Sequence, residues 1–162
     1  MMRGMLAVLT VALASTPAVS ASDVYEDTRE VFLSDATSPD TMVLLVTGEC
    51  DGMRLWARVE TSSGDTVLTL SHVATRLFND ADTCLDPDRV IAEFVGPMAY
   101  ATLPTEEDFT DPIRGYFPGD AETLAEARLS DLPVLCLKAG KSYADCYAAD
   151  QKGAVVIYST GS

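Results

Sequence analysis

Arg54, Trp56 and Arg58 are the residues of this chain whose types and spacing most directly suggest a binding site. They alternate with four apolar residues, Met53, Leu55, Ala57 and Val59. In a β-strand the three would share one face, and the apolar residues would lie on the other. An indole flanked by two guanidinium groups can hold an anionic or sugar-like group or anchor a protein interface. In the structural alternative, Trp56 packs beneath a helix and the arginine stems run along it.

Tyr116 and Phe117 form a second candidate contact site. They lie in the stretch 109–119, where aromatic residues are held between prolines and glycines. Long connections of this kind are typical of loops that present a contact surface. In the alternative interpretation, Phe109, Ile113 and Phe117 cover the core as a roof.

His72 is the only histidine of the chain, which excludes sites that need two or three imidazoles. On a strand it would share a face with Leu68, Leu70 and Ala74, so we expect a hydrogen-bonded, partly buried structural residue. A small hydrolase that uses carboxylates, with or without His72, stays open as an alternative, because 25 acidic residues place some pairs close together by chance. We assign no catalytic residue and no cofactor.

Two segments resemble ligand-binding loops without meeting their requirements. Gly140-Lys141-Ser142 matches the end of a phosphate-binding loop, but Leu135 stands where that pattern requires glycine. The segment 80–88 has carboxylates at alternate positions, yet Leu85 and Ile91 occupy the places where an EF-hand needs glycine and glutamate. We interpret this segment as a turn and a helix cap and assign no metal ligand. A structural protein that responds to divalent cations is the alternative.

The first 21 residues have the pattern of a cleavable signal peptide. A short leader with one basic residue, Arg3, precedes an apolar run over 6–14, and Val19-Ser20-Ala21 suits cleavage after Ala21. That run is too short to span a membrane. We therefore expect export to the periplasm or beyond the cell, with no membrane insertion after cleavage.

The mature chain predicted by this cleavage is strongly acidic. Loss of Arg3 leaves ten basic against 25 acidic residues, which changes the net charge from −14 to −15. Such a charge disfavours nucleic acid, phosphorylated ligands and anionic membranes, and it also keeps an exported protein soluble.

Four cysteines in an exported chain predict two disulfides, for which three pairings exist. We favour the local pairing, Cys50 with Cys84 and Cys136 with Cys146. A zinc site is the weaker alternative, because the chain has no Cys-x-x-Cys and one histidine.

The elements that must position these residues follow from hydrophobic patterning. Apolar or alternating runs bounded by turn residues predict strands, and Asp86-Pro87 supplies a helix cap and first helical residue. The predicted strands are 41–47, 53–59, 66–74, 132–138 and 154–159. The predicted helices are 87–95 and 120–129. We expect 22–32 to be a short helix or a frayed lead-in, 104–119 to be mostly loop, and a loop to follow 132–138.

These patterns predict an α+β fold with a mainly antiparallel sheet, two or three short helices and two disulfides. We expect 22–162 to form a single acidic domain, with 1–21 as the signal peptide. The expected function is a non-catalytic binding or accessory module for a protein partner. The candidate contact residues are Arg54, Trp56, Arg58, Tyr116 and Phe117.

Overall fold

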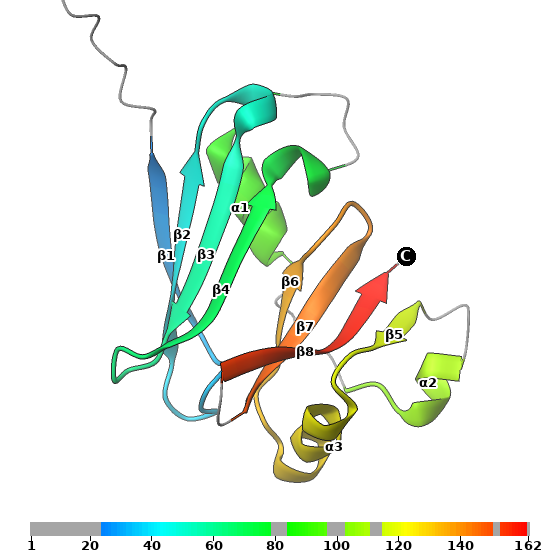
Figure 1. The fold of residues 1–162 in the computed structure, drawn as a ribbon. Coiled ribbons are helices and arrows are strands. Elements are labelled where there is room, and N and C mark those ends of the chain that lie inside the picture. Colours follow the sequence, from blue (N-terminus) through cyan, green and yellow to red (C-terminus); the bar gives the residue numbers. More distant parts are fainter. Residues whose placement is uncertain (1–23, 79–83, 97–102, 111–114, 151–152, 162) are drawn as a thin grey trace, which may run out of the picture.

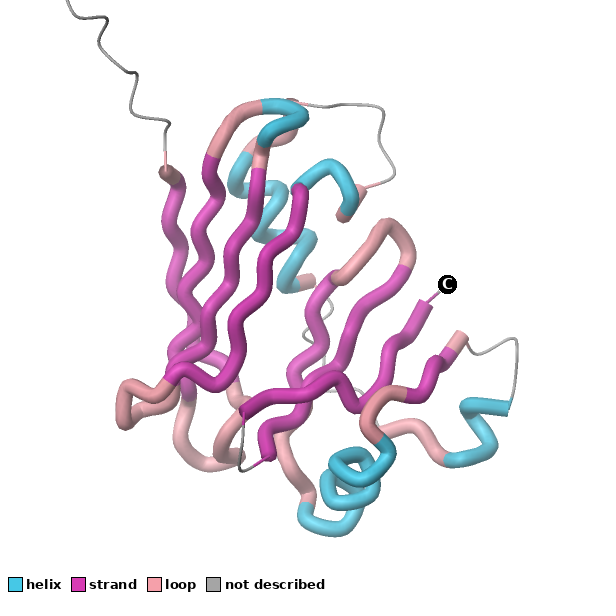
Figure 2. Tube along the Cα trace, in the orientation of Figure 1, coloured by secondary structure: helices cyan, strands magenta, loops and turns pink. Residues whose placement is uncertain are grey.

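The described chain is built around two four-stranded antiparallel sheets, as Figure 1 and Figure 2 show. The computed structural model describes residues 24–78, 84–96, 103–110, 115–150 and 153–161. Sheet A has the strand order β1-β2-β3-β4, and sheet B has the order β5-β8-β7-β6. With three helices and two disulfides, this arrangement confirms the predicted α+β class. The predicted signal peptide lies outside the described residues.

Sheet A is an up-and-down meander in which each strand pairs with the next one along the chain. Its strands are β1 (Tyr25–Val31), β2 (Asp40–Thr47), β3 (Arg54–Glu60) and β4 (Thr66–Val73). The expected strands in 41–47, 53–59 and 66–74 are therefore confirmed. The helix or lead-in expected at 22–32 is wrong, because backbone pairing with β2 makes this polar segment an edge strand.

Sheet B contains two strands that hydrophobic patterning missed, a short one within the expected loop 104–119 and a longer one after 132–138. Its strands are β5 (Tyr116–Pro118), β6 (Leu135–Lys138), β7 (Tyr143–Asp150) and β8 (Gly153–Gly161). The loop expected after β6 is in fact β7, which pairs with β6 on one side and β8 on the other. Its sequence is rich in alanine and aspartate, which disfavour strands, so these two neighbours decide its conformation.

Aspartate side chains cap the first turns of the two longer helices. In α1 (Pro87–Val95) the Asp86 side chain accepts a hydrogen bond from the Asp88 backbone N–H at 2.9 Å. In α3 (Ala121–Ser130) Asp120 accepts from the Thr123 N–H at 2.8 Å. Each cap satisfies a backbone donor that the first turn leaves unpaired. A third helix, α2 (Glu106–Thr110), is a single short turn.

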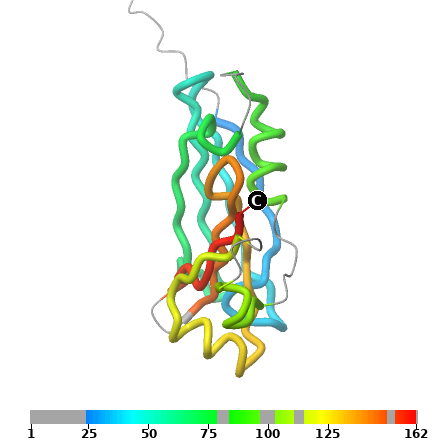
Figure 3. The backbone as a smooth tube through the Cα atoms, turned by 90° about the vertical axis from the view of Figure 1, so that its right-hand side faces the viewer, coloured from blue at the N-terminus to red at the C-terminus, as the bar shows by residue number. Residues whose placement is uncertain are grey.

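The main core joins the two sheets. It contains the inner face of sheet A, the apolar stripe of α1, and Leu135, Leu137 and Tyr147 from sheet B. α1 contacts both β2 and β6, and in Figure 3 it lies along one side of sheet A. A second cluster lies on the opposite face of sheet B, where α3 packs on β7 and β8. Sheet B is thus buried on both faces, which explains the nearly continuous apolar run through β6.

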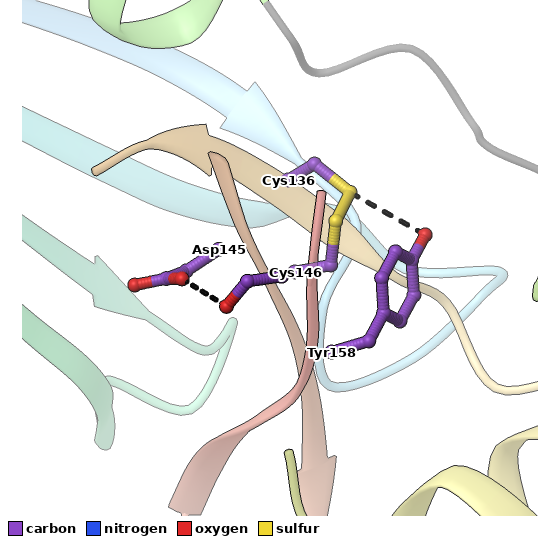
Figure 4. The surroundings of a disulfide bond; sticks show 5 residues. Cys136, Asp145, Cys146 and Tyr158 are labelled. Carbon is purple, nitrogen blue, oxygen red and sulfur yellow. Dashed lines mark hydrogen bonds between the residues drawn. A yellow bond between two sulfur atoms is a disulfide. The ribbon is translucent and has the colours of Figure 1, made fainter. Parts of the chain in front are cut away.

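Both disulfides have the predicted local pairing. Cys50–Cys84 connects the turn before β3 to the segment before α1. Cys136–Cys146 joins directly opposed positions of β6 and β7, with the Tyr158 phenol 3.8 Å from the Cys136 sulfur (Figure 4).

Candidate functional site

The outer face of sheet A gathers the first set of predicted contact residues. Along β3 the buried residues alternate with exposed ones, so Arg54, Trp56 and Arg58 all point away from the core. In the sheet register Leu45 lies opposite Trp56, and Val43 lies opposite Arg58. We call this surface the Trp56 face; it comprises Val43, Leu45, Arg54, Trp56, Arg58 and Thr69.

The Trp56 side chain is exposed to solvent rather than packed under a helix. It is 42% exposed, and no helix in the described part of the chain covers this side of the sheet (Figures 1 and 3). The structural alternative, in which Trp56 packs beneath a helix, is therefore wrong. A shallow, mainly apolar hollow of about 210 Å³ lies beside the ring, lined partly by Val43 and Leu45.

The two arginines of the Trp56 face differ in their partners. Arg58 forms an exposed ion pair with Glu60, with Nε and Oε1 3.1 Å apart. Arg54 makes no ion pair or side-chain hydrogen bond with any residue that the structure describes. Within the described structure, Arg54 is therefore the cation of this face that is available to meet an external carboxylate.

Tyr116 and Phe117 lie on β5 and point to opposite sides of it. Tyr116 is partly buried, with its ring centroid 6.4 Å from that of Phe109 and 5.8 Å from that of Tyr158. Phe109 packs against the second cluster, as the roof interpretation expects, and so does Tyr116. For Phe117 the roof interpretation is wrong, because this side chain is 59% exposed. Ile113 lies outside the described residues. The structure does not join this pair to the Trp56 face, because β5 belongs to sheet B and β3 to sheet A.

A larger hollow lies between the two sheets, and sequence patterning did not predict it. It has a volume of about 750 Å³ and runs between the end of β4 and the β6–β7 hairpin. Its lining includes three basic side chains, Arg54, Arg76 and Lys141, together with His72 and Asp145. We call it the inter-sheet groove.

His72 lines this groove from the inner side of β4. Its ring centroid lies 5.7 Å from that of Phe94 in α1, so the expected partial burial is confirmed. The expected hydrogen bond is absent at Nε2, which is buried without a partner among the described residues. Burial lowers the pKa of His72, and the negative charge of Asp145 opposes that shift. Near neutral pH the imidazole is therefore predominantly uncharged.

Asp145 projects from β7 and accepts a hydrogen bond from the Ser159 hydroxyl of β8 (Figure 4). It is the only carboxylate among the described residues that line the groove. Hydrolysis by paired carboxylates needs a second carboxyl group at a defined distance. The described part of the groove therefore offers no support for the hydrolase alternative.

The cation alternative concerns a segment that is described only in part. Residues 80–83 lie outside the described residues, while Asp86 caps α1 and Asp88 accepts a hydrogen bond from the Tyr25 hydroxyl. Within the described ranges, no group of three or more His, Cys, Asp or Glu side chains is placed to hold a metal ion.

Arg76, Lys141 and Asp145 are the groove residues that sequence reasoning missed. They come from the turn after β4, the β6–β7 hairpin and β7, so nothing in their spacing connects them. The phosphate-loop resemblance drew attention to Lys141 and Ser142, but in the structure they occupy a hairpin. There the Ala139 and Gly140 N–H groups donate to the Tyr143 carbonyl at 3.1 and 3.2 Å.

No protein-family model matches this chain, and neither does any curated protein or solved structure. Among the described helices, none is long and apolar enough to cross a membrane. The two disulfides are compatible with an exported protein. The Trp56 face and the inter-sheet groove are the two surfaces on which a function can be proposed.

Proposed function

We propose that this protein is an exported, non-catalytic binding module for a protein partner, and that the Trp56 face is its docking surface. The observation that supports this is an indole 42% exposed on an open sheet face, beside Val43 and Leu45 and between two arginines. Tryptophan and arginine are the residue types that contribute most to binding when a partner covers them.

The chemistry of this face favours a partner segment that presents an apolar side chain next to a carboxylate. The apolar side chain would fill the hollow of about 210 Å³ beside Trp56. The carboxylate would meet Arg54, which has no ion pair within the described structure. Arg58 could also contribute, because its exposed pair with Glu60 is weak and readily exchanged.

The test is affinity capture from the exported fraction with oxidised residues 22–162 as bait. Parallel baits carry Trp56→Ser or Leu129→Ser. Leu129 is 89% exposed on α3, so its change removes an exposed apolar side chain far along the chain from the Trp56 face. We expect a partner that wild type and Leu129→Ser retain and Trp56→Ser loses, with equal melting temperatures for all three baits.

Three results would overturn the proposal. One is equal retention of the partner by Trp56→Ser, and another is a partner lost only by a Phe117→Ser bait, which would place docking on β5. The third is a dimer in size-exclusion chromatography that Trp56→Ser abolishes, since a second copy of the chain would then cover this face.

A further inference from the structure

Three basic side chains have no partner among the described residues, and all three line the inter-sheet groove. Of the eight basic residues that the structure describes, four form ion pairs: Arg29, Arg58, Arg89 and Lys138. A fifth, Arg128, donates to the Pro104 carbonyl. Arg54, Arg76 and Lys141 form no ion pair or side-chain hydrogen bond with any described residue.

This arrangement is unusual for so acidic a chain. With 25 acidic and 11 basic residues, carboxylates are available to pair with every cation. Three cations around one hollow repel one another, and each can make a charge-assisted hydrogen bond to an anion. The local charge of the groove is thus opposite in sign to the net charge of the protein.

The rest of the lining includes several polar side chains. Ser71, Ser142 and Tyr143 contribute hydroxyl groups, and Asp145 contributes the single carboxylate. A carboxylate repels a ligand anion but accepts a hydrogen bond from a ligand hydroxyl. The volume of about 750 Å³ lies within the range of small-molecule sites.

We propose that the inter-sheet groove binds a small anion that carries two or more negative charges and a hydroxyl group. Arg54, Arg76 and Lys141 bind the negative groups of the ligand. Asp145 accepts a hydrogen bond from the ligand hydroxyl. Hydroxylated polycarboxylates and sugar phosphates share this chemistry. Arg54 belongs to both the groove and the Trp56 face, whereas Trp56 itself does not line the groove. The variants of each test therefore leave Arg54 unchanged, so that the two proposals can fail independently.

Isothermal titration with citrate, glucose 6-phosphate and tricarballylate tests the proposal. Citrate and glucose 6-phosphate distinguish carboxylate from phosphate recognition, and tricarballylate is citrate without its hydroxyl group. The first titrations use about 10 mM salt, where the Debye length is about 30 Å, and repeats use about 150 mM. We expect one of the hydroxylated anions to bind wild type, and citrate to bind more tightly than tricarballylate.

Matched variants separate the groove from the general effect of charge. Arg76→Gln/Lys141→Gln removes two groove cations, and Arg29→Gln/Arg89→Gln removes two paired cations that line neither the groove nor the Trp56 face. We expect the first variant to weaken binding by about tenfold or more and the second to leave it within about twofold. Trp56→Ser should bind the anion as wild type does.

A structural readout places the bound anion. Titration of the isotope-labelled protein should shift the amide signals of Ser71, His72 and the 139–143 hairpin, and leave those of β1 unchanged. The proposal is overturned if neither hydroxylated anion binds, or if both double variants lose binding equally. Tricarballylate binding as tightly as citrate would overturn the role given to Asp145.

Discussion

His72 shows at the residue scale how burial and charge act on one side chain. The imidazole packs against Phe94, and burial lowers its pKa while Asp145 acts in the opposite direction. The other charged groups that line the same groove are Arg54, Arg76 and Lys141. A neutral histidine in this position makes folding sensitive to pH on the acid side.

We predict that His72 lowers the free energy of unfolding as the pH falls. In the unfolded chain His72 is protonated below its ordinary pKa, near 6.5. In the folded chain its pKa is lower, so protonation of the folded protein needs a more acidic solution. The free energy of unfolding of wild type should therefore fall relative to that of His72→Gln between about pH 7.5 and 5.5. Urea unfolding of both proteins across this range measures the difference. A difference that stays constant, or grows in favour of wild type, would contradict the prediction.

At the element scale, the two disulfides hold different kinds of structure. Cys50–Cys84 closes a sequence separation of 34 residues and fixes the turn before β3 to the start of α1. Cys136–Cys146 closes a separation of 10 between strands that the backbone ladder already pairs. In the loop-entropy description, the longer loop restricts the unfolded chain more.

We expect Cys50→Ala/Cys84→Ala to lower the free energy of unfolding by about 4 kcal/mol, and Cys136→Ala/Cys146→Ala by about 3 kcal/mol. Denaturant unfolding of each variant against the oxidised wild type measures both values. Each double variant keeps the other disulfide, so each one serves as the control for the other. A loss below about 1 kcal/mol for either pair would show that the bridge does not restrain the unfolded chain.

At the scale of the whole molecule, the main core connects the two sheets. Leu135, Leu137 and Tyr147 of sheet B pack with the inner face of sheet A and with α1. Neither sheet can separate from the other without exposing these side chains to water. The shared core therefore favours unfolding in one step.

We predict that the two sheets unfold together. Trp56 fluorescence reports on sheet A, and the near-ultraviolet signal of a Trp56→Phe variant reports on the tyrosines, three of which lie in β7 and β8. Both probes, each compared with far-ultraviolet circular dichroism of the same protein, should give coincident urea transitions. Separated midpoints would show that the chain contains two independently folding parts, contrary to the expected single domain.

Sequence patterning was most informative where local chemistry and tertiary packing agree. The alternation along β3 placed Arg54, Trp56 and Arg58 on one face because side chains of a strand alternate. α1 begins where Asp86 and Pro87 predict, since a cap acts on its own first turn. The disulfide pairing followed from the short separations along the chain.

Patterning failed where a segment depends on its neighbours. β1 and β7 have polar or alanine-rich sequences, and they are strands because β2, β6 and β8 pair with them. Residue type alone carries little information about such strands, since β-propensity depends on the surroundings of the strand.

The sequence by itself determined the acidic composition, the local disulfide pairs and the position of Trp56 on the strand face opposite the apolar residues. Each of these depends on residue identity or on contacts close along the chain. Only the tertiary structure decided that Arg54, Arg76 and Lys141 meet in one groove and that Phe117 lies on a different sheet from Trp56. Those relations depend on how the two sheets pack, and that packing is set by many weak apolar contacts between residues distant in sequence.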